Sequence, residues 1–235
     1  MAERLILPGL TTTPGSDWRM KVEEIDRLGI KELALFPTCL GLEERRELYG
    51  LLEGTGLENI PHVHLRDDME NWEFDYLIGR YGTQVFNFHP DASSVDMLNR
   101  GEYLDRMYIE NLTEIDGIFL DCLEKCAGVC LDVSHWEDQG MIQKNKGYDG
   151  LENILQKNKI GCCHISAMND HFTVWPNYIT GKKIRYYSNH KLKDLSELDY
   201  VGKYVRYLPE IVSIELGNTF AEQLEIKKYL ERIIN

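Results

Sequence analysis

Short apolar segments alternate with amphipathic segments along the whole chain of 235 residues. The apolar segments are rich in Ile, Leu, Val, Phe and Cys, as buried parallel strands are. This pattern predicts strands at 4–9, 32–37, 60–65, 84–89, 106–110, 129–133, 160–166 and 211–216. Strands that alternate with helices form a parallel sheet, because each helix carries the chain back to the same edge of the sheet.

The amphipathic segments carry helix start and stop signals. Ser16-Asp17 precedes a helix predicted over 18–28, and Gly29 follows it as a C-cap. The other predicted helices span 42–52, 67–80, 94–100, 113–127, 147–157, 196–207 and 219–234. Eight strands each followed by a helix predict an α/β fold, a single (β/α)8 TIM barrel over residues 1–235. A doubly wound sheet is the alternative, but Pro8-Gly9-Leu10 lacks the Gly-rich phosphate turn that a nucleotide would need.

The longest segment without a regular pattern runs over 169–193. A loop of this length in a compact domain is usually a lid or a binding loop. We expect it to close over a small polar ring through its aromatic side chains, which are Trp175, Tyr178, Tyr186 and Tyr187.

Composition limits the partners that the protein can have. The net charge of −13 argues against nucleic acid and anionic membranes, because phosphate groups attract clustered Lys and Arg. No apolar run approaches the length of a signal peptide or a membrane span, so we expect a cytoplasmic protein with reduced cysteines. The spacing of the six cysteines fits no zinc or cluster motif, and we expect them to act as small buried apolar residues. No feature indicates an oligomeric state.

Ionisable residues stand at the carboxyl ends of four of the predicted strands. They are Glu110, Asp132, His164 and Glu215. A charged group inside a core strand costs several kcal/mol or more unless it is paired, and in a barrel all of these strand ends meet at one mouth. Three carboxylates there would repel one another unless a cation neutralised them. The donor set therefore predicts a divalent metal: zinc, manganese, magnesium or cobalt.

Five of the seven histidines extend this cluster. His62 and His64 are two residues apart on one strand and so face the same side. His89 ends the next strand, and His135 follows Asp132 by three residues. His190 lies at the end of the irregular segment, whereas His171 lies inside it and is not predicted to be a ligand.

The strand-end motifs resemble those of the xylose isomerase-like barrels, which group sugar isomerases and epimerases with endonuclease IV. The matching segments follow the family's order and are Phe86-Asn87-Phe88-His89-Pro90, Tyr108-Ile109-Glu110-Asn111, Leu131-Asp132-Val133-Ser134-His135, His164-Ile165-Ser166 and Ile214-Glu215-Leu216. With His62 they cover most of the chain. They are moderately specific for the superfamily and weak for any one reaction within it.

The resemblance implies roles for these residues. It implies a shared metal held by Glu110, Asp132, His164 and Glu215. In the endonuclease branch a second zinc would use His62 and His89 with Glu110 as the bridge, although His64 lies nearer the mouth. A third zinc would need His135 with an Asp-x-His segment, which here reads Ser188-Asn189-His190 and lacks the aspartate.

Three functions remain open at this point. The first is a metal-dependent isomerase or epimerase that acts on a small sugar, sugar phosphate or polyol through an enediolate. The resemblance implies Glu110 and Glu215 as its acid/base pair and His135 as a substrate contact. Arg66, Trp175 and His190 are further candidates for substrate binding. The second is a zinc phosphoesterase similar to endonuclease IV, and the third is a non-catalytic metal- or ligand-binding barrel.

Overall fold

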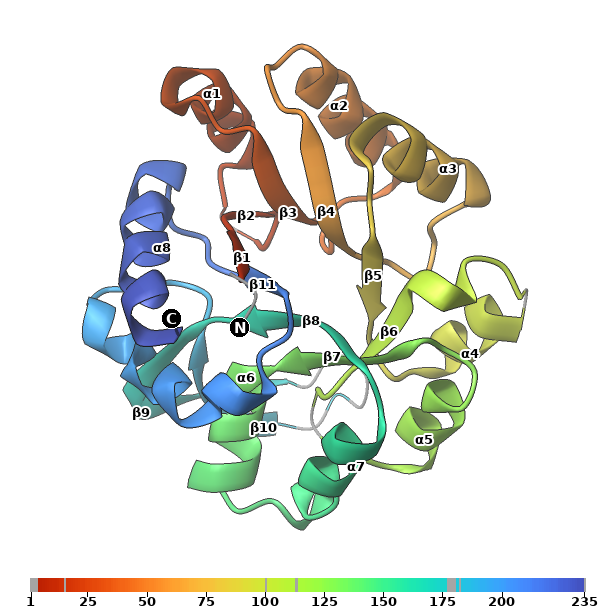
Figure 1. The fold of residues 1–235 in the computed structure, drawn as a ribbon, viewed down its shortest axis with the longest axis vertical. Helices are drawn as coiled ribbons and strands as arrows, with labels where there is room; N and C mark the ends of the chain where they lie inside the picture. Colours follow the sequence, from red (N-terminus) through yellow and green to blue (C-terminus); the bar gives the residue numbers. More distant parts are fainter. Residues whose placement is uncertain are drawn as a thin grey trace.

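A parallel sheet of nine strand segments curves into a nearly closed barrel at the centre of the computed structural model (Figure 1). The structure describes residues 4–14, 16–99, 101–112, 114–176, 181 and 183–234. The strand order is β1-β11-β8-β7-β6-β5-β4-β3-β2, and neighbouring strands pair in parallel.

The first barrel strand is divided at Pro8 into β1 (Leu5–Leu7) and β2 (Gly9–Thr11). Proline has no N–H to give to the ladder, so the strand is interrupted there. β1 pairs with β11 and β2 pairs with β3, so consecutive segments of the chain join the two ends of the sheet. The nine segments therefore form eight barrel strands, which confirms the predicted (β/α)8 TIM-barrel fold.

The remaining barrel strands lie close to their predicted positions. They are β3 (Glu32–Phe36), β4 (Asn59–His64), β5 (Val85–Phe88), β6 (Met107–Glu110), β7 (Gly128–Asp132), β8 (Ile160–Ile165) and β11 (Ile211–Ile214). Two buried cores result. The outer core lies between the sheet and the helices, and the inner core fills the barrel with Leu7, Ala34, Phe36, Val85, Tyr108, Cys130, Cys162 and Ile211.

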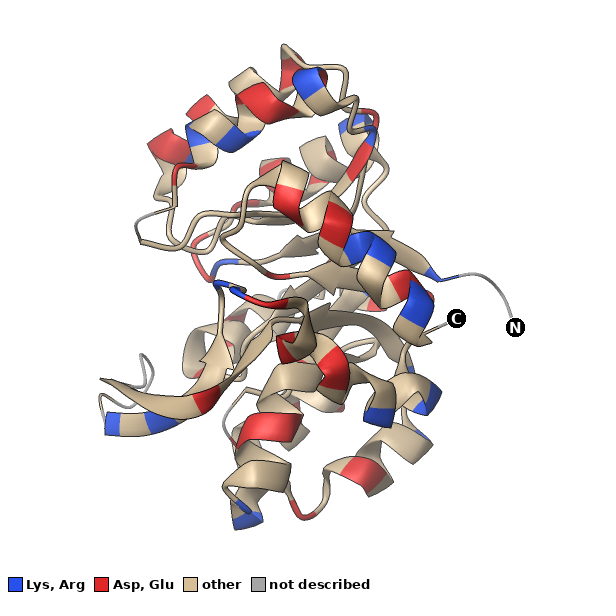
Figure 2. Cartoon of the chain, turned by 90° about the vertical axis from the view of Figure 1, so that its left-hand side faces the viewer, with Lys and Arg blue, Asp and Glu red and all other residues tan. Residues whose placement is uncertain are grey.

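Helices surround the sheet (Figure 1). They are α1 (Trp18–Leu28), α2 (Leu42–Glu53), α3 (Asn71–Tyr81), α4 (Ala92–Asn99), α5 (Gly117–Leu123), α7 (Leu151–Lys157), α8 (Phe220–Ile234) and the 3₁₀ helix η4 (Leu195–Tyr207). Gly29 ends α1 at φ +66°, in the left-handed region that favours glycine. Acidic and basic residues are interspersed along the helices of the face shown in Figure 2. None of the described helices is long and apolar enough to cross a membrane.

Several boundaries differ from the sequence prediction. The helix predicted over 113–127 is shorter, because Asp116 caps it by accepting from the N–H of Phe119. The helix predicted over 147–157 begins at Leu151, after the 3₁₀ helix η3 (Lys146–Tyr148). The sequence did not predict the 3₁₀ helix η1 (Leu104–Arg106), nor α6 (Val133–His135) with the π-helical segment η2 (Trp136–Ile142).

The prediction of an irregular segment over 169–193 is wrong. The described residues form an antiparallel hairpin of β9 (Ala167–Pro176) and β10 (Lys183–Asn189), which projects from the barrel (Figure 2). The carboxylate of Asp138 accepts hydrogen bonds from the backbone of Tyr187 and Ser188 at 2.9 and 3.1 Å, and so holds β10 against η2. Tyr178 lies outside the described residues.

A buried ion pair joins α2 to α3. The guanidinium of Arg45 donates to both carboxylate oxygens of Glu73 at 2.8 and 2.9 Å, and the hydroxyl of Tyr49 donates to the same carboxylate at 2.9 Å. The side chains of Arg45 and Glu73 are both fully buried. Removing Glu73 would leave the buried charge of Arg45 with only the partly exposed carboxylate of Asp68, 2.9 Å away.

We therefore expect Glu73→Gln to lower the free energy of unfolding by roughly 3 kcal/mol, measured by urea denaturation at neutral pH. The matched control is Glu47→Gln, which removes the same charge from the exposed pair with Arg19. It should change stability little, since both side chains of this pair are exposed and the charge of Arg19 remains solvated. Equal losses in the two variants would contradict a structural role for the buried pair.

Candidate metal centre at the barrel mouth

Four ionisable side chains meet at the carboxyl ends of the barrel strands. Glu110 ends β6, Asp132 ends β7, His164 lies near the end of β8, and Glu215 directly follows β11. The parallel register places Asp132 beside His164. The barrel topology thus brings together the residues that the sequence motifs predicted as shared metal ligands.

Donor atoms of three of these residues are close enough together to bind one ion, and Glu110 adjoins them. His164 Nδ1 lies 3.4 Å from Glu215 Oε2 and 3.6 Å from Glu110 Oε2. Donor atoms of Asp132, His164 and Glu215 lie within 4.8 Å of one another, and Glu110 forms an overlapping group of the same size with Asp132 and His135. Three carboxylates and an imidazole are ligands that suit zinc, manganese or magnesium.

Two of these donor atoms are buried without a hydrogen-bond partner among the described residues. They are Asp132 Oδ2 and His164 Nδ1. A buried polar atom left in this way costs about 1–3 kcal/mol, so each such atom requires an explanation. A cation between Asp132 and His164 would satisfy both atoms. The residues present therefore fit a divalent metal.

Neighbouring polar groups orient the ligands. Asp132 Oδ1 accepts from the hydroxyl of Ser134 at 2.5 Å and from the N–H of His135 at 2.8 Å, which leaves Oδ2 to face the group. The amide of Asn87 donates to Glu110 Oε2 at 2.7 Å. Hydrogen-bond partners of this kind hold metal ligands in place and raise the affinity of the site for the metal. Asn87 had a detectable signal in the sequence, since it is a polar residue inside the apolar run of β5.

The pKa shifts reflect the charge crowding at the mouth. Burial lowers the pKa of His164, but the carboxylates of Glu110 and Glu215 outweigh it and raise that pKa to about 10. Burial raises the pKa of Glu215, but the charges of His190 and His164 lower it to about 2. Burial likewise opposes ionisation of Glu110, yet His89 and His164 hold its pKa well below the usual range. The carboxylates of Glu110 and Glu215 are therefore ionised at neutral pH, and the mouth attracts positive charge.

A second group of donors adjoins the first at Glu110. His64 Nε2 lies 3.1 Å from His89 Nε2 and 3.2 Å from Glu110 Oε2, and His89 Nε2 lies 3.6 Å from Glu110 Oε1. Two imidazole nitrogens and a carboxylate form a nitrogen-rich position beside the first group.

His62 does not join this second group, contrary to what the resemblance implied. It lies two residues before His64 on β4, about 6–7 Å deeper in the barrel. Both ring nitrogens are engaged there, Nδ1 with Ser213 Oγ at 2.7 Å and Nε2 with Asn87 Oδ1 at 2.9 Å. His64 therefore takes the place beside His89 and Glu110.

His135 and His190 line the pocket above the metal-ligand group. His135 Nε2 lies 3.4 Å from Asp132 Oδ2, and Asp132 with Glu110 raises the pKa of His135 against the effect of burial. His190 Nδ1 lies 3.2 Å from the carbonyl oxygen of Glu215 and 3.8 Å from Glu215 Oε1. Among the described residues, His190 belongs to no group of three donors within 4.8 Å.

The other predicted substrate contacts lie on the walls of this pocket. Trp175 is 61% exposed on β9, and it lines the pocket together with Tyr186 of β10. Arg66 also lines it, but its guanidinium already donates to Asp68 at 2.9 Å and to the carbonyl of Thr38 at 2.7 Å. His171 is exposed and paired with Asp170. Asp138, which holds the hairpin wall, was missed because it lies in a helix that the sequence did not predict.

The sequence matches no protein-family model and no curated protein. Twelve chains of solved structures are similar to this one, among them the following two. A xylose isomerase-like TIM barrel protein from Mycobacterium smegmatis, in complex with magnesium, is 14% identical with a TM-score of 0.50, covering 98% of this chain and 97% of that one. An uncharacterized B. cereus protein is 11% identical with a TM-score of 0.47, covering 99% of this chain and 65% of that one. The first likeness supports the predicted TIM-barrel fold.

Proposed function

We propose that the protein is a metal-dependent isomerase or epimerase that acts on a small sugar, sugar phosphate or polyol. The observation that carries this proposal is a pair of buried donor atoms, Asp132 Oδ2 and His164 Nδ1, which lie among three carboxyl groups and form no hydrogen bond with the described residues. The similar protein from Mycobacterium smegmatis was solved with magnesium, which supports a divalent cation here. Glu110, Asp132, His164 and Glu215 would hold that cation, which we expect to be zinc, manganese or magnesium.

A bound divalent cation supplies Lewis-acid stabilisation of the negative charge that develops on substrate oxygens. The chain's own residues would bind the substrate and move the proton. Trp175 and Tyr186 form an aromatic wall of the pocket, which suits the apolar face of a small polar ring. His135 reaches the same pocket and can donate a hydrogen bond to a substrate hydroxyl.

Glu215 is the stronger candidate for proton transfer. Its side chain is 12% exposed against 2% for Glu110, and both residues line the pocket. Oε2 of Glu215 faces His164, whereas Oε1 lies toward His190 on the pocket side. One oxygen can thus belong to the metal site while the other exchanges a proton with a substrate carbon. Glu110 would serve as the opposing acid or base.

A zinc phosphoesterase similar to endonuclease IV is the second candidate. The group of His64, His89 and Glu110 favours it, because that group offers a place for a second ion bridged by Glu110. The third position of the endonuclease pattern is occupied by Ser188, whose hydroxyl donates to Asp138 at 3.1 Å. A carboxylate at position 188 would face that of Asp138 and be repelled by it. A metal-dependent isomerase or epimerase therefore accounts better than a phosphoesterase for the residues found at the mouth.

We expect His164→Ala to weaken divalent-metal binding by at least about 100-fold, since even indirect partners of a metal ligand contribute about 10–100-fold. The measurement is calorimetric titration of metal-stripped protein with Mn²⁺ and Zn²⁺. His171→Ala is the control, because that imidazole is exposed and pairs with Asp170 outside the pocket. Equal affinities of the two variants would rule out His164 as a ligand.

We expect Glu215→Gln to lower turnover by about 10²–10⁴-fold through the loss of an acid/base group. The assay is isomerisation or epimerisation across a panel of aldoses, ketoses and their phosphates with Mg²⁺, Mn²⁺ or Zn²⁺. Glu210→Gln is the matched control, because Glu210 flanks the same strand, β11, at the opposite end and is exposed. A folded Glu215→Gln variant with wild-type turnover would refute the assignment. Turnover of abasic-site DNA in place of sugars would favour the phosphoesterase.

A further inference from the structure

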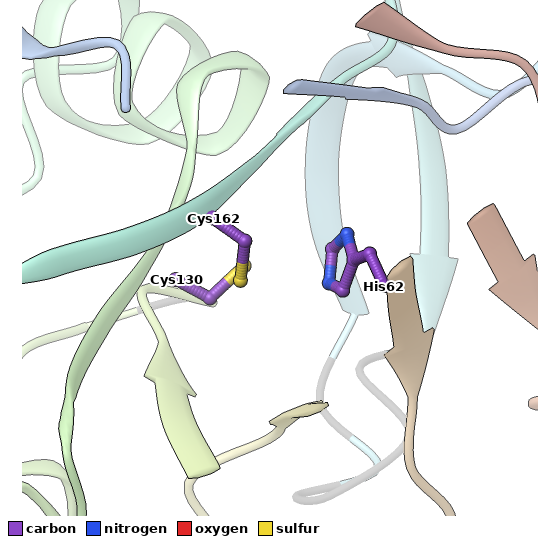
Figure 3. A group of neighbouring side chains, drawn as sticks. All are labelled: His62, Cys130 and Cys162. Atoms are coloured by element: carbon purple, nitrogen blue, oxygen red, sulfur yellow. The ribbon is translucent and has the colours of Figure 1, made fainter. Parts of the chain in front are cut away.

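A second cluster of metal-binding residue types lies inside the barrel, one layer below the mouth. It consists of His62 on β4, Cys130 on β7 and Cys162 on β8 (Figure 3). Each of these residues stands two positions before a residue of the mouth, namely His64, Asp132 and His164. Residues two apart on a strand face the same side, about 6–7 Å apart along it. The cluster is therefore a deeper layer of the barrel interior.

The three side chains converge although they are distant in sequence. In Figure 3 the imidazole of His62 faces the sulfur atoms of Cys130 and Cys162. One nitrogen of His62 and the two sulfur atoms lie within 4.8 Å of one another, and all three residues are fully buried. Cys130 and Cys162 occupy paired positions on adjacent strands, so the backbone fixes their proximity.

A fourth donor borders the cluster. His164 Nε2 lies 3.3 Å from the sulfur of Cys130, and the His62 and His164 rings are 5.1 Å apart. The other ring nitrogen of His164 faces the carboxylates of the mouth. One imidazole thus separates an oxygen-rich group above from a sulfur-containing group below.

We propose that His62, Cys130 and Cys162 form a second metal site for a thiophilic d10 cation, Zn²⁺ in particular, with His164 Nε2 as the nearest fourth donor. Two thiolates and two imidazoles are a donor set that zinc takes in tetrahedral sites. Binding would take both sulfurs as thiolates, and with neutral imidazoles the site would carry no net charge, which matters in a dry interior where an uncompensated ion is costly. If the mouth cation also binds His164 Nδ1, the ring would lose its remaining proton and bridge the two ions as an imidazolate. The thiolate donors of this site favour softer cations, whereas the carboxylates of the mouth favour harder ones.

The surroundings of His62 suit a metal ligand. Its two nitrogens contact Ser213 Oγ and Asn87 Oδ1, so one of these hydrogen bonds has to give way when the imidazole binds a metal. The remaining hydrogen bond would fix the ring, as partners of ligating histidines do. Asn87 also donates to Glu110, so this network joins the deeper site to the mouth.

The test uses Cd²⁺, because its thiolate complexes absorb in the ultraviolet whereas the oxygen and nitrogen donors of the mouth give no such band. The reduced full-length protein is refolded with excess Cd²⁺, which allows the ion to enter before the barrel closes, and is then dialysed against a chelator. We expect wild-type protein to retain one Cd²⁺ per chain together with the thiolate band. Zn²⁺ loaded in the same way should be retained in the same amount.

Cys163→Ser is the matched control. Cys163 is adjacent to Cys162 and equally buried, but it packs in the outer core rather than inside the barrel. We expect Cys130→Ser and Cys162→Ser to lose the band and the retained ion, and Cys163→Ser to keep both. All variants keep the exposed Cys39, so binding at that thiol cancels in the comparison.

Wild-type protein that refolds but shows no chelator-resistant thiolate band would overturn the proposal, whatever the variants do. Loss of the band in Cys163→Ser as complete as in Cys162→Ser would overturn it as well. Circular dichroism identifies any variant that fails to refold, and the comparison then rests on the other cysteine variant and the wild type. If the protein turns over no sugar but retains Cd²⁺ as expected, the proposed isomerase function is wrong and the second metal site is still supported.

Discussion

The carboxyl groups of Glu110, Asp132 and Glu215 are buried together at the barrel mouth, and like charges there would repel unless positive charge lies between them. Without a bound metal, the protonated imidazole of His164 supplies part of that compensation, since its Nδ1 lies 3.6 Å from Glu110 and 3.4 Å from Glu215. Ser134 and the N–H of His135 hold Asp132 Oδ1, which leaves Oδ2 to face the cluster. A bound cation would take the place of the His164 proton and supply the compensation, and the proposed chemistry depends on it.

The period of two along each barrel strand makes the interior a stack of layers. In the upper layer the strands contribute carboxylates and imidazoles, which suit hard or borderline cations. One layer down, β7 and β8 contribute the thiols of Cys130 and Cys162, which suit softer ions. His164 touches both layers through its two ring nitrogens, so an ion below would hold the orientation of a ligand above.

The sequence predicted the barrel because buried parallel strands leave a strong apolar signal, and it predicted the mouth because a charge at the end of such a run is costly. It could not predict the hairpin, since most side chains of β9 are exposed and show no apolar alternation. The sequence also did not decide whether His62 or His64 joins the group with His89. Both side chains face inward, and only the depth of each residue in the barrel shows that His64 contacts His89. Cys130 and Cys162 carry no spacing motif, because strand register rather than sequence proximity brings them together.

The central claim is that one divalent cation occupies the carboxylate and imidazole group at the mouth. The most direct test is a crystal structure of the protein with Mn²⁺, with data that reveal the anomalous scattering of the ion. We expect a strong anomalous peak in contact with Asp132 Oδ2 and His164 Nδ1, between the carboxylates of Glu110 and Glu215. A mouth without such a peak at saturating Mn²⁺, or an ion bound away from Asp132 and His164, would contradict it.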